Sequence, residues 1–153
     1  MLSCWRIVQE RFSGQAFSGE GARLYGGRWN SPGHPVVYTA SSRSLAVLEM
    51  LVHLDSPQLL SSYLLYEASF PESLVTELAA SDLPADWRLD PALRSAQTIG
   101  DKWIRGGSSA VLRIPSVLIP EESNYLLNPN HPDFKPIRIS APQKYAFDPR
   151  LKS

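Results

Sequence analysis

The segment from residue 43 to residue 54 places one carboxylate in an almost wholly apolar stretch. Between Leu45 and Leu54 only Glu49 and His53 are polar, and their separation of four residues puts both on one face of a helix. An ionised carboxylate in an apolar setting is costly unless it meets a partner, opens onto a cleft or becomes neutral. Glu49 is therefore either part of a structural ion pair on a narrow solvent-facing stripe or a carboxylate at the floor of a pocket.

An arginine and a tyrosine precede this segment in positions that suit ligand binding. Gly26-Gly27 allows a sharp bend and a close approach just before Arg28, whose guanidinium fits a phosphate or a carboxylate. Tyr38 lies in a short β-prone run, where its ring could stack on a planar group. Each also has an ordinary alternative, a solvated arginine on a turn and a core tyrosine. Together with Glu49 they predict a cleft for an anionic, ring-bearing metabolite, with the carboxylate stabilising a developing positive charge.

Other kinds of site find less support in the spacing. The three histidines show no metal-ligand spacing with Cys4 or the acids, so no metal is expected. No glycine-rich phosphate fingerprint opens a helix, and residues 107–110 lack the nucleophile-elbow pattern. Ser116 follows a strand and a proline, a place that suits a pocket hydroxyl or a turn cap. Residues 124–133 are expected to form a turn-rich loop, whose asparagines bond either their own backbone or a ligand.

The elements that position these residues are short, because thirteen prolines interrupt the chain. Strands are expected around residues 5–8, 36–39, 63–70 and 110–114, with a closing hairpin from 137–139 and 144–147. Helices are expected at 43–54, capped by serines, and at 92–105, stopped by two glycines. Residues 13–27 predict a long loop, and 74–83 fit either a short helix or irregular chain. This pattern favours a single α+β domain with a mixed or antiparallel sheet and a few helices.

Length and composition restrict the class of protein. A chain of 153 residues, 43% apolar and 20% charged, suits one globular domain with its own core. Fifteen basic and fifteen acidic residues cancel, so no global field favours direct nucleic-acid binding or a membrane surface. The single Cys4 fits a reducing compartment, and no signal-peptide pattern or membrane-length apolar run is present. We expect a soluble cytoplasmic protein.

The ordered set of segments resembles a known family. Residues 27–30 (Gly-Arg-Trp-Asn), 37–40 and 48–51 resemble the N-terminal half of a RES-domain toxin, and 110–116 with 124–134 resemble its C-terminal half. The resemblance identifies residues 1–153 as a single RES domain with its core at about 5–151. It places the arginine, glutamate and serine of the family name at Arg28, Glu49 and Ser116, with Tyr38 as the aromatic partner.

The resemblance implies a toxin of a bacterial toxin–antitoxin system with an ADP-ribosyltransferase-like fold. The implied reaction is cleavage of the nicotinamide–ribose bond by hydrolysis or phosphorolysis, with NAD as substrate rather than cofactor. ADP-ribosyl transfer to a host protein is the alternative, and a non-catalytic NAD-binding module is a third. The implied partner is an Xre-type antitoxin that blocks the active site, and homo-oligomerisation within such a complex stays open.

The resemblance also implies roles for single residues. Glu49 would stabilise an oxocarbenium-like centre or orient the acceptor, with Arg28 and Tyr38 as the other catalytic residues. Arg28 would hold the pyrophosphate or a ribose, Tyr38 would clamp the nicotinamide side, and Ser116 would bond to ribose or carboxamide. The weaker candidates for lining the NAD site are Tyr25, Asn30 and Asn124. His53 and Cys4 receive no implied role.

Overall fold

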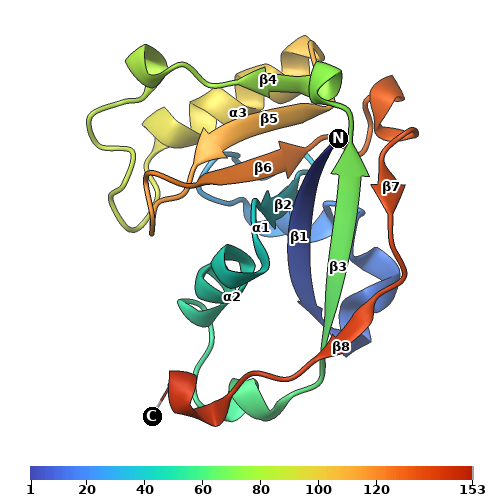
Figure 1. Cartoon of the computed structure of the whole chain (residues 1–153). Coiled ribbons are helices and arrows are strands. Elements are labelled where there is room, and N and C mark those ends of the chain that lie inside the picture. Colours follow the sequence, from blue (N-terminus) through green and yellow to red (C-terminus); the bar gives the residue numbers. More distant parts are fainter. Residues whose placement is uncertain (153) are drawn as a thin grey trace.

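A strongly curled β-sheet organises the chain, and the structure, a computed structural model, describes residues 1–152. Within these residues the strand order is β4-β5-β6-β2-β1-β3-β7, with β8 also paired to β3. The pair β4–β5 is parallel and the others are antiparallel. Figure 1 shows β1 and β3 running down the molecule while β4, β5 and β6 run across its upper part. The sheet therefore turns from one direction to the other around the short strand β2.

The strands coincide with the runs rich in β-branched and aromatic residues. Their bounds are β1 (Leu2–Gln9), β2 (Val37–Ala40), β3 (Tyr63–Phe70), β4 (Val75–Glu77), β5 (Val111–Pro115), β6 (Ser123–Leu127), β7 (Arg138–Ile139) and β8 (Gln143–Tyr145). The pair β1–β2 is joined at one position only, Trp5 opposite Ala40. By contrast, β1 pairs with β3 over all eight residues of both strands. The sheet is thus held weakly where its direction changes.

Residues 1–152 contain the α-helices α1 (Glu20–Tyr25), α2 (Arg43–Leu51) and α3 (Arg94–Gly106), of which α2 and α3 pack on this sheet. Helix α2 begins where Ser42 Oγ accepts a 3.0 Å hydrogen bond from the Leu45 N–H. It packs on β1 and β2 through one apolar cluster. Helix α3 ends at Gly107, whose φ of 61° is the left-handed conformation that glycine favours. It packs against β5 and β6 through a second cluster that includes Ala96 and Trp103.

The predicted α+β fold class is confirmed, and most elements lie near their expected places. Strand β3 covers the predicted residues 63–70, and α3 is displaced by one or two residues from the predicted 92–105. Helix α2 ends at Leu51, three residues early. Its apolar sequence predicts a helix buried all round, but Leu48 and, just beyond the helix, Val52 are exposed. The helix covers the sheet with one face only.

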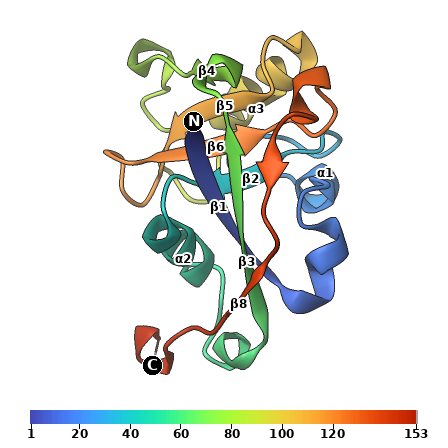
Figure 2. The ribbon, with the colours of Figure 1, turned by 45° about the vertical axis from the view of Figure 1, so that its right-hand side comes forward.

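Three predicted segments differ from the structure. Residues 13–27 contain α1, because the left-handed glycines Gly19 and Gly26 lie at the two ends of a helix rather than throughout a loop. Residues 137–147 form no hairpin: β7 and β8 follow one another along the edge of β3 and both pair with it (Figure 2). Residues 124–127 belong to β6, which pairs with β2 on one side and β5 on the other, and are not a loop. The ambiguous segment 74–83 contains the short strand β4.

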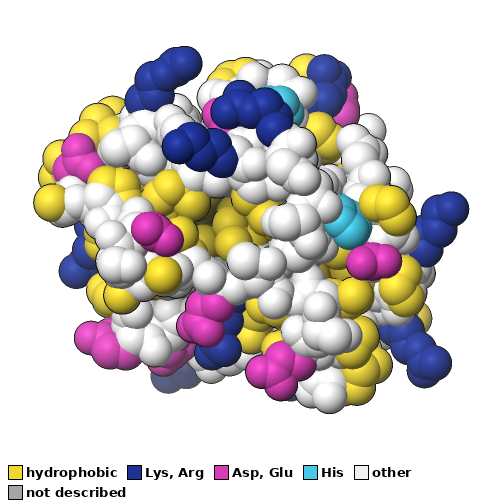
Figure 3. Space-filling view, turned by 90° about the horizontal axis from the view of Figure 1, so that it is seen from above, with side chains coloured by type: hydrophobic (Ala, Val, Ile, Leu, Met, Phe, Trp, Pro, Cys, Tyr) yellow, Lys and Arg dark blue, Asp and Glu magenta, His cyan; other side chains and the backbone are white. Residues whose placement is uncertain are grey.

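The surface carries charges of both signs. Figure 3 shows basic and acidic side chains spread over one face, with hydrophobic side chains lining a central hollow. No helix within residues 1–152 has the length and hydropathy required to span a membrane.

Candidate active site

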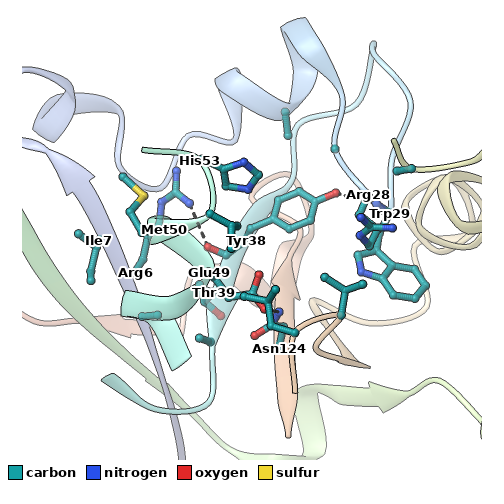
Figure 4. A pocket seen from close by; sticks show the side chains of 18 of the residues that line it. Arg6, Ile7, Arg28, Trp29, Tyr38, Thr39, Glu49, Met50, His53 and Asn124 are labelled. Carbon is teal, nitrogen blue, oxygen red and sulfur yellow. Dashed lines mark hydrogen bonds between the residues drawn. The ribbon is translucent and has the colours of Figure 1, made fainter. Parts of the chain in front are cut away.

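A cavity of about 780 Å³ lies where α2 and the bend of the sheet meet the segment 84–92. Its walls include four of the seven predicted site residues, namely Arg28, Tyr38, Glu49 and Asn124. In Figure 4, Arg28 and Trp29 lie on one side of the Tyr38 ring and His53 and Arg6 on the other, with Glu49 and Asn124 between them. Residues from distant parts of the sequence thus meet in one concave site of the size that small-molecule sites have.

Glu49 reaches the cavity from α2 and is fixed by two side-chain donors. Ser116 Oγ donates a 2.6 Å hydrogen bond to Glu49 Oε1, and Asn124 Nδ2 donates a 2.9 Å bond to the same oxygen. Within residues 1–152, no hydrogen bond engages Oε2. Of the two sequence-based alternatives, the structure therefore supports a carboxylate in a pocket, held by neutral donors and not by an ion pair.

Arg28 is bound to the segment that forms the cavity's outer wall. Its Nη1 donates to the carbonyl oxygens of Trp87 (3.0 Å) and Leu89 (2.8 Å). Its Nη2 lies 3.9 Å from Asp90 Oδ1, where the Arg28 side chain is 17% exposed and that of Asp90 is 93% exposed. A pair with so exposed a carboxylate is weak, so an anionic ligand can replace Asp90 at Nη2. Arg28 therefore has two tasks, holding the wall and facing the cavity.

Helix α3 sets the position of the loop that carries Arg28. Gln97 Nε2 donates to the Gly27 carbonyl at 3.1 Å, and Asp101 accepts from both the N–H and the hydroxyl of Ser31. Between these two contacts, a Cβ on Gly100 would lie 1.8 Å from the Trp29 carbonyl oxygen. Only glycine at this point allows the loop to lie directly on the helix.

Tyr38 uses its hydroxyl for the loop and its ring for the cavity. The hydroxyl donates a 2.6 Å bond to Asn30 Oδ1 and accepts a 3.1 Å bond from the Trp29 N–H. Burial raises the pKa of Tyr38 well above its usual range, so the phenol stays neutral near pH 7. The hydroxyl is thus unsuited to act as a base, whereas the ring is one side of the cavity.

Arg6 is a cavity residue that the sequence reasoning missed. Its Nε donates to the Ala16 carbonyl at 2.6 Å and its Nη1 to the Tyr38 carbonyl at 2.9 Å, in the gap beside the single β1–β2 pair. Burial lowers the pKa of Arg6 to about 10, which leaves it charged at neutral pH. A charged residue in the middle of an apolar strand was the available signal. Arg88, also on the cavity wall, lies in a segment without a sequence motif.

Comparison with known proteins places this geometry in a family. A model of the RES domain matches residues 3–148. The chain belongs to the RES domain family. "Toxin Res" of Yersinia enterocolitica is 44% identical over 152 residues, which cover 99% of this chain and 100% of that protein. The sequence-based resemblance to RES-domain toxins is confirmed.

Two more RES relatives carry names that state an activity. The "Prs ADP-ribosylating toxin" of a Sphingobium species is 40% identical over 154 residues, covering 97% of this chain and 96% of that protein. The "NAD(+) phosphorylase MbcT" of Mycobacterium bovis is 31% identical over 128 residues, covering 76% and 68%. The crystal structure of the M. tuberculosis MbcT–MbcA toxin–antitoxin complex aligns with 98% of this chain and 86% of that chain, at a TM-score of 0.78 and 18% identity. This last likeness concerns the fold.

The other predicted residues of this RES domain lie outside the cavity wall. Ser116 is fully buried and donates to Glu49 from behind the cavity wall, whereas Asn30 is fully buried beneath Tyr38. Tyr25 ends α1, is 83% exposed and does not line the cavity, because the helix turns it outward. Ser116 and Asn30 therefore support residues that line the cavity. Tyr25 neither lines the cavity nor supports a residue that does.

Cys4 and His53, which received no role from the sequence, also differ in place. Burial raises the pKa of the Cys4 thiol to about 12, so the thiol stays protonated and inert inside the sheet. His53 follows the end of α2, is exposed, and lines the cavity mouth. Within residues 1–152, no group of three or more His, Cys, Asp or Glu side chains is arranged to hold a metal ion.

Proposed function

We propose that this RES domain is a toxin-type enzyme that binds NAD in the cavity and cleaves the nicotinamide–ribose bond beside Glu49. The observation that carries the proposal is the Glu49 carboxylate in a cavity of about 780 Å³, held through Oε1 by Ser116 and Asn124 with Oε2 left for the substrate. The printed names of the Mycobacterium and Sphingobium relatives support NAD-type substrates and ADP-ribosyl chemistry.

Cleavage of the nicotinamide–ribose bond creates a positive charge that a carboxylate at the position of Glu49 can stabilise. As the bond between the pyridinium nitrogen and ribose C1′ breaks, nicotinamide leaves with the electron pair and positive charge develops on the ribose. A carboxylate already fixed by two donors stabilises that charge without reorganising, and its free oxygen can orient an acceptor. The acceptor then bonds to C1′ and loses its proton, which leaves an ADP-ribosyl product.

The charges on the cavity wall suit a dinucleotide. The wall carries three arginines, Arg6, Arg28 and Arg88, against the two acids Glu49 and Asp90. The cavity is therefore locally basic although the whole chain has no net charge. Arginine binds phosphate oxygens through paired N–H groups, so Arg28 is the proposed site of the NAD pyrophosphate, in place of Asp90.

Product analysis tests the proposal and separates the acceptors. Purified protein is incubated with NAD, with and without inorganic phosphate, and the products are resolved by chromatography and mass spectrometry. Free nicotinamide with ADP-ribose indicates hydrolysis, and nicotinamide with a phosphorylated ADP-ribose indicates phosphorolysis. NAD that binds but persists in both conditions contradicts the enzyme and supports a non-catalytic binding module.

ADP-ribosyl transfer is the second candidate, because the Sphingobium relative at 40% identity is named for that activity. NAD labelled in the adenylate is incubated with bacterial lysate, where a discrete labelled protein band supports transfer. Label found only in small molecules supports hydrolysis or phosphorolysis. The Glu49→Gln variant, which is expected to be inactive, serves as the control in both experiments.

The proposed setting is a cytoplasmic toxin–antitoxin pair. The solved neighbour is a complex of a toxin with an antitoxin, which supports an antitoxin as the partner of this chain. Co-expression with the product of a neighbouring small gene, followed by size-exclusion chromatography, tests this partner. A stable complex that no longer consumes NAD is the expected result, and whether that partner is of the Xre type is settled by its sequence.

A further inference from the structure

Two buried polar atoms on the cavity wall have no hydrogen-bond partner within residues 1–152. They are Nε1 of Trp5, a donor, and Oδ1 of Asn124, an acceptor. Leaving such a group unpaired costs about 1–3 kcal/mol, so folded proteins rarely keep one without a reason. A ligand that brings one acceptor and one donor satisfies both atoms, and a primary amide carries the two on separate atoms of one planar group.

The two side chains project from the same face of the sheet. Trp5 is opposite Ala40 across β1 and β2, and Ala40 is opposite Asn124 across β2 and β6. Residues in register on adjacent strands point to the same side of the sheet. Two strand spacings separate the Cα atoms of Trp5 and Asn124 by roughly 10 Å. Ala40, which lies between them in this row, also lines the cavity. The row therefore carries an unpartnered donor at one end and an unpartnered acceptor at the other.

The orientation of the Asn124 amide is fixed by Glu49. Its Nδ2 donates to Glu49 Oε1 at 2.9 Å, and the reversed amide would set two oxygens against each other. Oδ1 is therefore the atom of this amide that is left without a partner. The Arg43 guanidinium lies over the indole of Trp5, 5.1 Å from the ring centroid.

We propose that Trp5 and Asn124 bind the carboxamide of the nicotinamide ring, with Asn124 Oδ1 accepting from its N–H and Trp5 Nε1 donating to its carbonyl oxygen. This inference rests on the proposed function and extends it to substrate specificity. Because Asn124 contacts Glu49 with one atom and the carboxamide with the other, the bond to be broken lies beside Glu49. Nicotinic acid, which has a carboxylate in place of the amide, brings a negative oxygen to Asn124 and is disfavoured.

The test compares NAD with nicotinic acid adenine dinucleotide as substrates, by kcat/KM for release of the base. The wild-type protein is expected to prefer NAD by tenfold or more. Asn124→Ala lowers kcat/KM for NAD more than for the acid analogue, so this preference falls about tenfold. Trp5→Phe keeps the ring but loses the N–H, and it lowers kcat/KM for both substrates because both carry a carbonyl oxygen.

Ser116→Ala is the matched control, because it removes the other donor to Glu49 and leaves Trp5 and Asn124 unchanged. It is expected to lower turnover of both substrates equally and to keep the preference for NAD. If Asn124→Ala also keeps the preference, Asn124 only positions Glu49 or meets a ribose hydroxyl, and the inference is wrong. If the wild-type protein cleaves the two substrates equally well, it is also wrong. If the wild-type protein cleaves neither, the proposed function fails first.

Discussion

Ser116 connects the backbone of the β5–β6 turn to the carboxylate of Glu49. Its Oγ donates a 2.6 Å hydrogen bond to Glu49 Oε1 and accepts hydrogen bonds from the backbone N–H groups of Leu118 (3.1 Å) and Ile119 (3.2 Å). The hydroxyl is fully buried, so these contacts have no water to replace them. The geometry therefore gives Ser116 the task of holding Glu49.

Ser116→Ala is expected to lower both stability and turnover. The change leaves two backbone N–H groups without their buried acceptor, which costs about 1–3 kcal/mol in the free energy of unfolding. Glu49 loses one of its two donors, so kcat falls while KM for NAD changes little. Urea unfolding and steady-state kinetics measure the two effects. A tenfold rise in KM with unchanged kcat would show that Ser116 contacts the substrate directly.

Glu49→Gln is expected to remove activity and to leave the fold intact. Glutamine keeps an oxygen that can accept from Ser116 and Asn124, but it has no negative charge to stabilise the ribose cation. The loss of one such electrostatic contribution lowers kcat by about 10²- to 10³-fold. NAD loss is followed by chromatography, with circular dichroism to confirm folding. Glu72→Gln, an exposed carboxamide substitution outside the cavity, is the matched control, and equal activity in the two variants would refute the mechanism.

Much of the fold could be predicted because local patterns determine it. Strand β3 is an apolar and aromatic run ended by Pro71, and helix α3 carries an apolar stripe ended by glycine, and these signals act over a few residues. Strands β7 and β8 were predicted as a hairpin because proximity in sequence suggests pairing. The long edge of β3 offers more hydrogen bonds to each of them, and that is a tertiary effect with no local signature.

The candidate site could be predicted only in part, for the same reason. Arg28, Tyr38 and Glu49 were found because glycine neighbours, a β-prone run and an apolar helix mark them locally. That Arg28 binds the backbone around Arg88 depends on contacts between residues about sixty positions apart. Arg6 was missed because its surroundings come from Tyr38 and Ala16, which its own strand does not predict.

Arg28→Lys is expected to weaken NAD binding and to loosen the cavity wall. Lysine keeps the charge but cannot hold two carbonyl oxygens with one nitrogen and still present others to a phosphate. We expect KM for NAD to rise about tenfold or more. Trypsin is expected to cleave faster after Arg88, because in the wild-type protein Arg28 holds the carbonyl groups on either side of it, those of Trp87 and Leu89. Arg94→Lys, exposed at the start of α3, is the control. An unchanged KM would exclude the role of Arg28 in NAD binding, and unchanged proteolysis would exclude its role in holding the cavity wall.

Two glycines of α3 are expected to respond to alanine in opposite ways. A Cβ on Gly100 would lie 1.8 Å from the Trp29 carbonyl oxygen, and backbone must move to accept it. Gly100→Ala is expected to destabilise the protein by about 3 kcal/mol or more and to displace the Arg28 loop. Gly106→Ala meets nothing within 4 Å and is expected to be neutral or to stabilise by up to about 1 kcal/mol. Thermal unfolding of both variants measures the contrast, and equal effects would show that the loop does not depend on this contact.

Tyr38→Phe is expected to reveal the hydroxyl as a structural group through stability and its dependence on pH. The variant leaves Asn30 Oδ1 and the Trp29 N–H unpaired, which costs about 1–3 kcal/mol near pH 8. Because burial raises the pKa of Tyr38, the folded state keeps this proton above pH 10 while the unfolded chain, with a phenol pKa near 10, loses it. The unfolded state then binds fewer protons, so this contribution makes the free energy of unfolding fall as pH rises.

The phenylalanine variant lacks that contribution, so its stability is expected to fall less steeply between pH 8 and pH 11 than that of the wild-type protein. Urea unfolding across this range measures the slopes, and Tyr25→Phe, altered at an 83% exposed tyrosine, should follow the wild-type curve. The pH profile of turnover in Tyr38→Phe should keep its shape, because a phenol that stays protonated and donates to Asn30 transfers no proton to substrate. Loss of one limb of that profile would instead make Tyr38 an acid or base in the reaction.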